Sequence, residues 1–344
     1  MDLFAFTRAL VDIESVTNNE AGVGEFLFRH LCPLAAKYGG RVERLEVEAQ
    51  RFNVFASWGT PVVTLSTHMD TVPPFFPSRE DDNFLWGRGS SDAKGIIAAM
   101  ICAIEELLAE GISELGLLFV VGEERNSAGA RVAAKTPRGS RYLINGEPTE
   151  NKLCVASKGA LRFELEARGR LAHSGYPQLG QSAIDALLDV LEDIRRIPLP
   201  EDSVLGKSTL NIGTISGGRA PNVVADEARA ELMYRLVGDA RPVREAVQKA
   251  VADRVDLREV LHTPVCQFSA FDGLPTTVVA FTTDVPTLQT TWGTPFLIGP
   301  GSIQVAHTAE ERIAKRELRA AVSIYTSMVT RILASRAEAP GKFQ

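Results

Sequence analysis

The sequence predicts an α/β fold with a mostly parallel sheet and a second, inserted domain. Strand-like runs such as Val62–Thr67 and the unbroken apolar run Leu115–Val121 alternate with helical patterns such as Ala93–Ala109, which is typical of parallel strands covered by helices. The 344 residues exceed the size at which one hydrophobic core usually stops growing. From about Gly159 apolar and polar residues begin to alternate, which is typical of half-buried antiparallel strands.

The first part of the chain shows strands and helices in turn. Gly39 and Gly40 favour the end of the second helical segment. The expected elements are helices Leu3–Ile13 and Gly24–Tyr38, strands Asn53–Ser57 and Val62–Thr67, helix Ala93–Ala109, and strands Leu115–Val121 and Arg141–Asn145. Near the C-terminus they are helix Leu274–Phe281, a mixed segment Trp292–Ile298 and a long helix Ala309–Leu333.

The middle of the chain predicts strands and helices in the order β-α-β-β-α-β, which forms a small open sandwich. The expected elements are strand Ala160–Ala167, helix Ser182–Arg195, strands Thr209–Ser216 and Ala228–Leu236, helix Ala240–Ala252 and a strand near Val260–Phe268. We therefore expect one α/β domain formed by residues 1–158 and 271–344, interrupted by an α+β domain at 159–270.

Composition excludes several classes of function. There are 37 lysines and arginines against 43 acids and no basic cluster, so we expect no nucleic-acid partner. The longest apolar stretch, near Gly95–Ile104, is about half the length of a membrane span. The N-terminus lacks the pattern of a signal peptide, and the four cysteines form no CxxC pair. We therefore expect a cytoplasmic protein with reduced thiols and no membrane partner.

Candidate metal ligands occur where buried strands end. The segment VVTLSTHMD ends in His68 and Asp70, and open α/β sheets bind ligands at the carboxyl ends of their strands. A carboxylate two residues after a histidine can fix the tautomer of a metal-binding imidazole. The alternative is a loop histidine that hydrogen-bonds a nearby acid.

Three further acidic side chains lie in similar places. Asp92, in WGRGSSDAKG, stands at the start of a helix, so it could instead be a helix cap. Glu123 and Glu124 follow the strand in LLFVVGEERNSAGA; the alternative there is a solvated acidic loop.

Glu147 follows the strand in YLINGEPTE and His307 precedes the last helix in GPGSIQVAHTAEERI. Alone they could be an ordinary turn residue and a structural histidine. Together, the two imidazoles and three carboxylates suit a pair of divalent ions such as zinc. Glu123, beside a ligand, could take a proton from a water that the ions activate. The sequence therefore predicts a hydrolase.

The motifs STHMDTVP, WGRGSSDAKG, GEERNSAG, NGEPT and AHTAEE occur in one order along nearly the whole chain. In this the chain resembles the aminoacylase, acetylornithine deacetylase and succinyl-diaminopimelate desuccinylase family of di-zinc amidohydrolases. The resemblance implies two Zn²⁺ ions, with Co²⁺ or Mn²⁺ as alternatives. The implied ligands are His68 and Glu147 at one ion, Glu124 and His307 at the other, and Asp92 between them.

The resemblance also implies roles around the ions. Glu123 would be the general base, and Asp70 would orient His68. The peptide after Asp92 is often cis in the family, so we expect a cis bond between Asp92 and Ala93.

Residues 159–270 correspond to the family's lid or dimerisation domain. His173, in GRLAHSGYP, would stabilise the oxyanion in the partner subunit of a homodimer; the alternative is a histidine packed locally. Asn222 and Arg235 would hold the substrate's carboxylate, a task for which a guanidinium is suited, and Gly301 and Ser302 would line the pocket.

The expected reaction is hydrolysis of the amide bond of a small N-acyl amino acid, such as an acetylated or succinylated diamino acid. GPGSIQ and the dipeptide Ala225-Asp226 depart from common family patterns, and these changes weaken the substrate assignment only. A di- or tripeptidase or carboxypeptidase of the same family stays open. A non-catalytic, metal-dependent dimer that binds amino-acid derivatives is the third alternative. A two-zinc aminopeptidase without a lid is disfavoured by residues 159–270.

Overall fold

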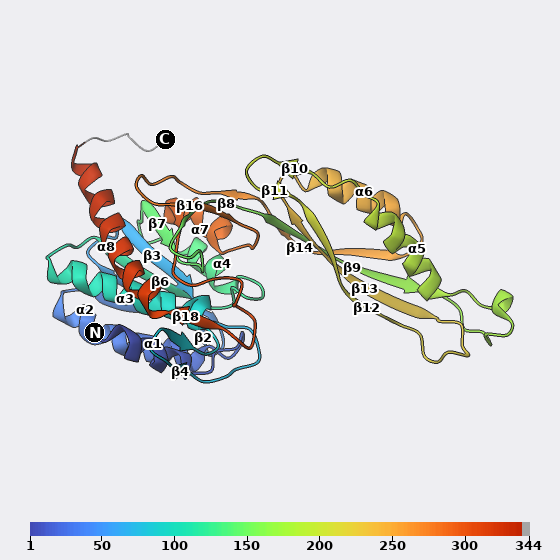
Figure 1. Ribbon diagram of the computed structural model, residues 1–344, viewed down its shortest axis with the longest axis horizontal. Coiled ribbons are helices and arrows are strands. Elements are labelled where there is room, and N and C mark those ends of the chain that lie inside the picture. The colour runs from blue at the N-terminus through green and yellow to red at the C-terminus, as the bar shows by residue number, and fades with distance from the viewer. Residues whose placement is uncertain (339–344) are drawn as a thin grey trace. The chain divides into compact units, whose positions relative to one another are not determined.

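The computed structural model describes residues 1–338, which form two compact units (Figure 1). Unit 1 contains residues 1–155, 268–277 and 283 onward, and unit 2 contains residues 156–267 and 278–282. Among residues 1–338, none of the helices combines the length and apolar character that crossing a bilayer requires.

The sheet of unit 1 places its parallel strands in the centre. Its order is β1 (Arg41–Glu48), β2 (Arg51–Trp58), β6 (Leu115–Val120), β3 (Val63–His68), β7 (Tyr142–Asn145), β17 (Thr294–Leu297) and β8 (Leu153–Ser157). The four strands from β6 to β17 are parallel, and the flanking strands pair antiparallel. The expected α/β fold is confirmed. Strand β17 lies between β7 and β8, although β7 and β8 are neighbours in the chain.

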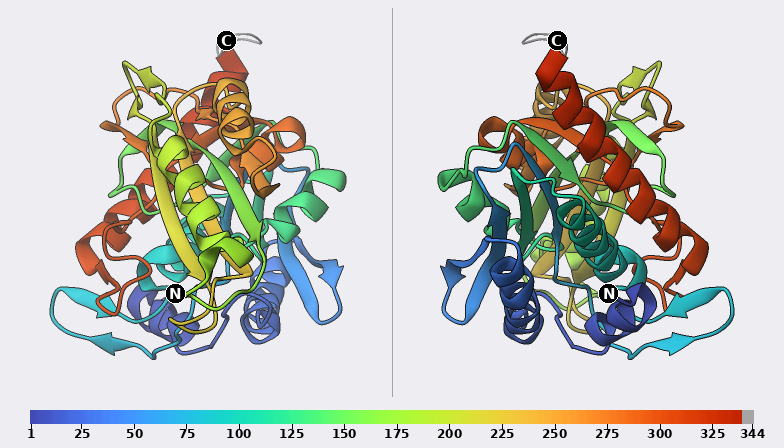
Figure 2. Two further views of the ribbon diagram at one scale, coloured as in Figure 1. Left: turned by 90° about the vertical axis from the view of Figure 1, so that its right-hand side faces the viewer. Right: turned by 90° about the vertical axis from the view of Figure 1, so that its left-hand side faces the viewer.

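Helices cover both faces of this sheet because its strands are apolar on both faces (Figure 2). Leu117 and Phe119 of β6 belong to the large core cluster, whereas Leu118 and Val120 face a second cluster with Trp292. The helices of the large cluster are α1 (Leu3–Val11), α2 (Ala21–Lys37), α3 (Gly95–Ala109) and α8 (Lys315–Glu338). Those of the second are α4 (Ala128–Lys135) and α7 (Val285–Trp292).

A small sheet brings a late segment of the chain to an early loop. Strand β18 (Arg312–Ala314) pairs antiparallel with β5 (Phe84–Trp86), which pairs with β4 (Arg79–Glu80). The segment before β18 is therefore held beside residues 87–92, which follow β5.

Unit 2 is a four-stranded antiparallel sheet with two helices on one face (Figure 2, left). The elements follow the predicted order: β9 (Gly159–Arg168), α5 (Ala183–Arg195), β12 (Thr209–Gly217), β13 (Glu227–Leu236), α6 (Arg241–Val251) and β14 (Asp256–Thr263). A hairpin of β10 (Glu201–Asp202) and β11 (Gly206–Lys207) precedes β12. Strands β15 (Cys266–Gln267) and β16 (Thr276–Val279) both pair with β8.

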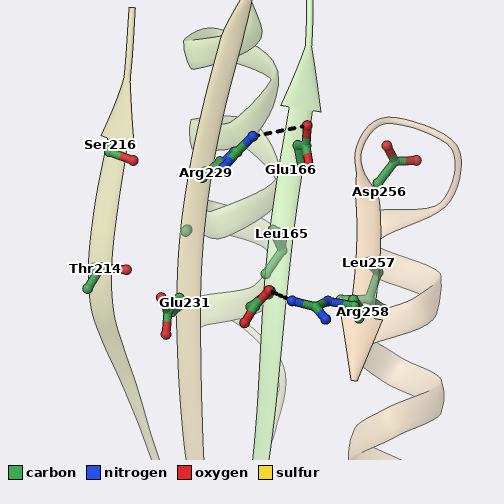
Figure 3. A pocket seen from close by; sticks show the side chains of 11 residues that line it. Leu165, Glu166, Thr214, Ser216, Arg229, Glu231, Asp256, Leu257 and Arg258 are labelled. Carbon is green, nitrogen blue, oxygen red and sulfur yellow. Dashed lines mark hydrogen bonds and ion pairs between the residues drawn. The ribbon is translucent and has the colours of Figure 1, made fainter. Parts of the chain in front are cut away.

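The other face of this sheet is polar because the strands alternate. Leu165 of β9 is buried under the helices, whereas Glu164 and Glu166 point to the opposite face. There they form ion pairs with Arg258 and Arg229 around a depression of about 480 Å³ (Figure 3).

The clearest differences from the expected elements are the following. The last strand of the inserted domain, expected near Val260–Phe268, is β14 and begins at Asp256 and ends at Thr263. Leu274–Phe281 is not a helix: its β-branched run Thr276–Val279 forms β16, in agreement with the strand preference of such residues. The last helix begins at Lys315 rather than Ala309, because residues 312–314 pair with β5. Helix α3 begins at Gly95 rather than Ala93, after an irregular turn over Ser90–Lys94.

Candidate metal centre

Four of the predicted acidic and imidazole side chains lie where three parallel strands end, at one edge of the sheet. His68 is the last residue of β3 and pairs in register with Val120, the last residue of β6. Glu123 and Glu124 follow β6, and Glu147 follows β7. Parallel strands end at the same edge, so the loops carry these side chains into one region.

Asp92 lies between two imidazoles, one on each of its oxygens. His68 Nε2 is 3.0 Å from Asp92 Oδ1, and His307 Nε2 is 3.4 Å from Asp92 Oδ2. His307 Nε2 is also 3.0 Å from Glu124 Oε1. His68, Asp92 and Glu124 each offer a donor atom, and these atoms all lie within 4.8 Å of one another. The arrangement suits a carboxylate that bridges two ions.

The electrostatics of this cluster are those of buried acids compensated by imidazoles. Burial opposes protonation of His68, but its hydrogen bonds to Asp70 and Asp92 outweigh burial and raise its pKa well above the ordinary value. Hydrogen bonds to Asp92 and Glu124 raise the pKa of His307 to about 10. Burial favours a neutral Asp92, yet hydrogen bonds from both imidazoles lower its pKa.

Two further carboxylates belong to the same cluster. Burial, and then the charge of Glu147, raise the pKa of Glu123 well above its usual range. Burial likewise raises the pKa values of Glu147 and Glu124. Buried carboxylates this close together repel one another, and divalent cations would relieve that repulsion. Imidazole nitrogens and carboxylate oxygens are also the donors that zinc accepts, so the residues fit a two-ion site.

Asp70 organises the loop that carries Glu123 and Glu124. His68 Nδ1 lies 3.0 Å from the main-chain oxygen of Asp70 and 3.5 Å from its carboxylate. The carboxylate accepts hydrogen bonds from the main-chain N–H groups of Glu123 (3.1 Å) and Glu124 (3.3 Å) and from the Thr17 hydroxyl (2.7 Å). Thr17 was not recognisable from the sequence, because it lies about fifty residues from its acceptor.

Two other buried acids near the cluster were missed. Burial raises the pKa of Asp284 to about 6, and the Ser127 hydroxyl and His68 partly offset this effect. Glu311 lies within the AHTAEE motif and accepts a hydrogen bond from the main-chain N–H of Asp92. The AHTAEE motif is the one sequence signal that pointed to Glu311. We see no such signal for Asp284.

The predicted substrate-side residues lie in two places. Gly301 packs against Ser91, where an added Cβ would lie 2.3 Å from the serine oxygen, and Ser91 Oγ lies 3.4 Å from the carbonyl of Ser302. These two residues therefore adjoin the loop that carries Asp92. The Asp92–Ala93 peptide bond is cis, as expected.

The other substrate-side residues belong to unit 2. His173 forms an isolated β-bridge with Val223, and the main-chain N–H of Ser174 donates to the carbonyl of Asn222. Both His173 and Asn222 are exposed, whereas Arg235 is half-buried on β13. Their roles toward a substrate stay predictions.

Comparison with known proteins shows the family. Residues 64–331 match the model of peptidase family M20/M25/M40. A peptidase M20 domain-containing protein of Schizosaccharomyces pombe is 39% identical over 341 residues, covering 95% of this chain and 84% of the relative. A probable carboxypeptidase of Aspergillus flavus is 38% identical over 379 residues, covering 96% and 88%.

Solved structures share the fold. A tripeptidase of Staphylococcus aureus superposes with a TM-score of 0.77 at 20% identity, covering 94% of this chain and 96% of the other. A dinuclear metal-binding M20 peptidase of Bacillus subtilis gives a TM-score of 0.67 at 15% identity, covering 96% and 98%. Taken with the family match, the fold and the ligand cluster, these relatives show that the chain is a metallopeptidase-type hydrolase of amide bonds and belongs to peptidase family M20/M25/M40.

Proposed function

We propose that this protein is a di-zinc amidohydrolase that cleaves small N-acyl amino acids. The observation that carries the proposal is the Asp92 carboxylate, which has His68 on one oxygen and His307 on the other. Glu147 would complete the ion site of His68, and Glu124 that of His307. Co²⁺ or Mn²⁺ would be accepted by the same donors.

Glu123 is proposed to move the proton. Bound divalent ions lower the pKa of water and polarise a carbonyl oxygen. A carboxylate of raised pKa keeps a proton more readily, and burial with the charge of Glu147 raises the pKa of Glu123. Glu123 would take one proton from the attacking water as the C–O bond forms. It would return that proton to the amine nitrogen as the C–N bond breaks.

Substitution of Glu123 by Gln tests this role. Turnover should fall about 10²- to 10⁴-fold, the usual contribution of a general base, while the protein still binds two metal ions per chain. Glu106→Gln, on the exposed side of α3, is the matched control and should retain wild-type turnover. Near-normal turnover by the Glu123 variant would eliminate the role.

The substrate is proposed to carry a free α-carboxylate, held by Asn222 and Arg235. This feature is shared by N-acyl amino acids and by the substrates of a carboxypeptidase. The relatives' names, a probable carboxypeptidase and a tripeptidase, support the peptidase alternative equally well. A panel of N-acetyl and N-succinyl amino acids, unblocked di- and tripeptides, and N-blocked peptides separates the two. Exclusive cleavage of unblocked peptides would refute the deacylase proposal.

A homodimer through unit 2 is proposed to bring His173 to the partner's site. Glu123→Gln and His173→Ala each remove one function from every site of their own homodimers. When the two variants are mixed, heterodimers should regain activity if His173 acts across the dimer. One of the two sites in each heterodimer then has both Glu123 and His173. Failure to regain activity in subunits that do exchange would refute action in trans.

Two expectations remain, a cytoplasmic location and catalytic activity rather than binding alone. The four cysteines are proposed to be reduced thiols, as is usual for the proposed cytoplasmic location. Loss of hydrolysis on chelation, with recovery on adding Zn²⁺, would exclude a non-catalytic binding protein.

A further inference from the structure

Glu311 is a buried carboxylate that takes no part in the proposed reaction. Its Oε1 accepts hydrogen bonds from three main-chain N–H groups, those of Gly89 (3.0 Å), Ser91 (3.2 Å) and Asp92 (3.1 Å). Only 1% of Glu311 is exposed, so water cannot easily replace these bonds. One oxygen atom thus holds the main chain that precedes and includes the proposed bridging ligand, Asp92.

The second oxygen of Glu311 is paired with an arginine. Arg88 Nη1 donates to Glu311 Oε2 at 2.6 Å, and Arg88 Nε donates to the carbonyl of Pro74 at 3.2 Å. Arg88 is also buried. The pair keeps the negative charge compensated, since an isolated buried carboxylate would be strongly unfavourable.

The loop needs an external acceptor because its backbone is not helical. Asp92 has φ −130° and ψ 89°, and Ala93 has φ −133° and ψ 25°, so the helical hydrogen-bond pattern is interrupted here. Buried N–H groups without an acceptor are costly. Glu311 supplies that acceptor from a segment more than two hundred residues later in the chain.

The segment of Glu311 also carries a proposed ligand. His307 precedes Glu311 by four residues, and the main-chain N–H of Gly87 donates to the carbonyl of Glu311 at 3.1 Å. Directly after Glu311, Arg312 pairs with Trp86 in the small sheet. The same attachment therefore holds His307 and the loop of Asp92 together.

We propose that Glu311 is a positioning residue for the metal centre, which fixes the main chain of Asp92 relative to His307. The inference rests on the two-ion site proposed above. It predicts that metal affinity depends on the acceptor oxygen of residue 311 even when no charge is present there.

The test compares Arg88→Met/Glu311→Gln with Arg88→Met/Glu311→Leu. Both double variants lack the two charges and have similar side-chain volumes, but only Gln offers an oxygen to the three N–H groups. Titration of the metal-free proteins with Co²⁺, followed by its visible absorption, measures affinity directly. We expect the Leu variant to bind Co²⁺ about 10- to 100-fold more weakly than the Gln variant, the usual effect of losing a group that orients a ligand. Affinities equal within about twofold would overturn the inference.

Two controls separate positioning from stability and from the site itself. Leu31→Ala, in the buried face of α2, lowers stability outside the proposed site and should bind Co²⁺ as the wild type does. His68→Ala should lose tight binding of one ion. Wild-type Co²⁺ binding by His68→Ala would overturn the metal site. If His68→Ala loses Co²⁺ binding while the Leu variant binds as tightly as the Gln variant, only the role of Glu311 is overturned.

If the Leu variant does not fold, Glu311→Asp replaces it. The shorter side chain keeps the charge but withdraws the carboxylate from the three N–H groups. Weaker Co²⁺ binding with a changed absorption spectrum would support positioning, and a wild-type spectrum and affinity would refute it.

Discussion

Replacement of Asp70 by Asn should weaken the loop that carries Glu123 and Glu124. The carboxylate accepts three hydrogen bonds, one on Oδ1 and two on Oδ2. An asparagine oxygen can keep at most the two bonds of Oδ2, now as neutral bonds that are each weaker by about 1 kcal/mol. Its NH₂ group would face the N–H of Glu123, and an unsatisfied buried donor costs about 1–3 kcal/mol.

The sum is a loss of about 3–5 kcal/mol. At about 2–4 °C per kcal/mol for a unit of this size, the unfolding temperature should fall by at least about 6 °C. Scanning calorimetry of the metal-free protein measures this, and kcat should fall with it because Glu123 is displaced. Asp81→Asn is the control: Asp81 also accepts three hydrogen bonds, but it is exposed, so its loss should be clearly smaller. A shift of less than about 2 °C for Asp70→Asn would refute the reasoning.

Three other changes have defined outcomes. Hydrogen bonds to carboxylates raise the pKa of His307 to about 10, so a metal ion must displace the proton of His307 at neutral pH. Metal affinity should therefore rise with pH up to about 10. Calorimetric titration with metal in two buffers should show proton release, and the absence of proton release would contradict this prediction. Glu20→Gln breaks a buried ion pair with Arg51 (2.6 Å) and should lower the free energy of unfolding in urea by about 3–5 kcal/mol. A loss of less than about 1 kcal/mol would show that the pair contributes little. The Tyr234 hydroxyl is buried without a hydrogen-bond partner among the described residues, so Tyr234→Phe should leave the unfolding temperature unchanged or raise it, and a marked fall would reveal a bound water.

The parts of the fold that could be predicted are those in which local pattern and burial agree. Leu115–Val120 is buried throughout and was recognisable as a buried strand. The proposed ligands at the ends of β3, β6 and β7 could be grouped because parallel strands end at the same edge of a sheet. Strand β1 was not recognised, since Leu45 is its only fully buried residue. The predicted C-terminal helix starts before the observed one because residues 312–314 pair with β5. No local sequence pattern encodes that pairing.

The site follows the same division. A proposed ligand is recognisable from its own chemistry and its place at the end of a strand, as His68 and Glu147 are. Thr17 and Glu311 act by accepting or donating hydrogen bonds to segments far away in the chain, so their roles depend on a register that only the folded structure defines.

The position of β17 between β7 and β8 has a consequence for biosynthesis. Its partner β7 lies about 150 residues earlier in the chain. During translation, the apolar edge of β7 that pairs with β17 therefore stays unpaired until the whole intervening segment has been synthesised. Late closure of this kind slows folding and exposes an aggregation-prone edge. Heterologous production should therefore respond more to slower translation or to chaperones than to changes that merely stabilise the finished protein.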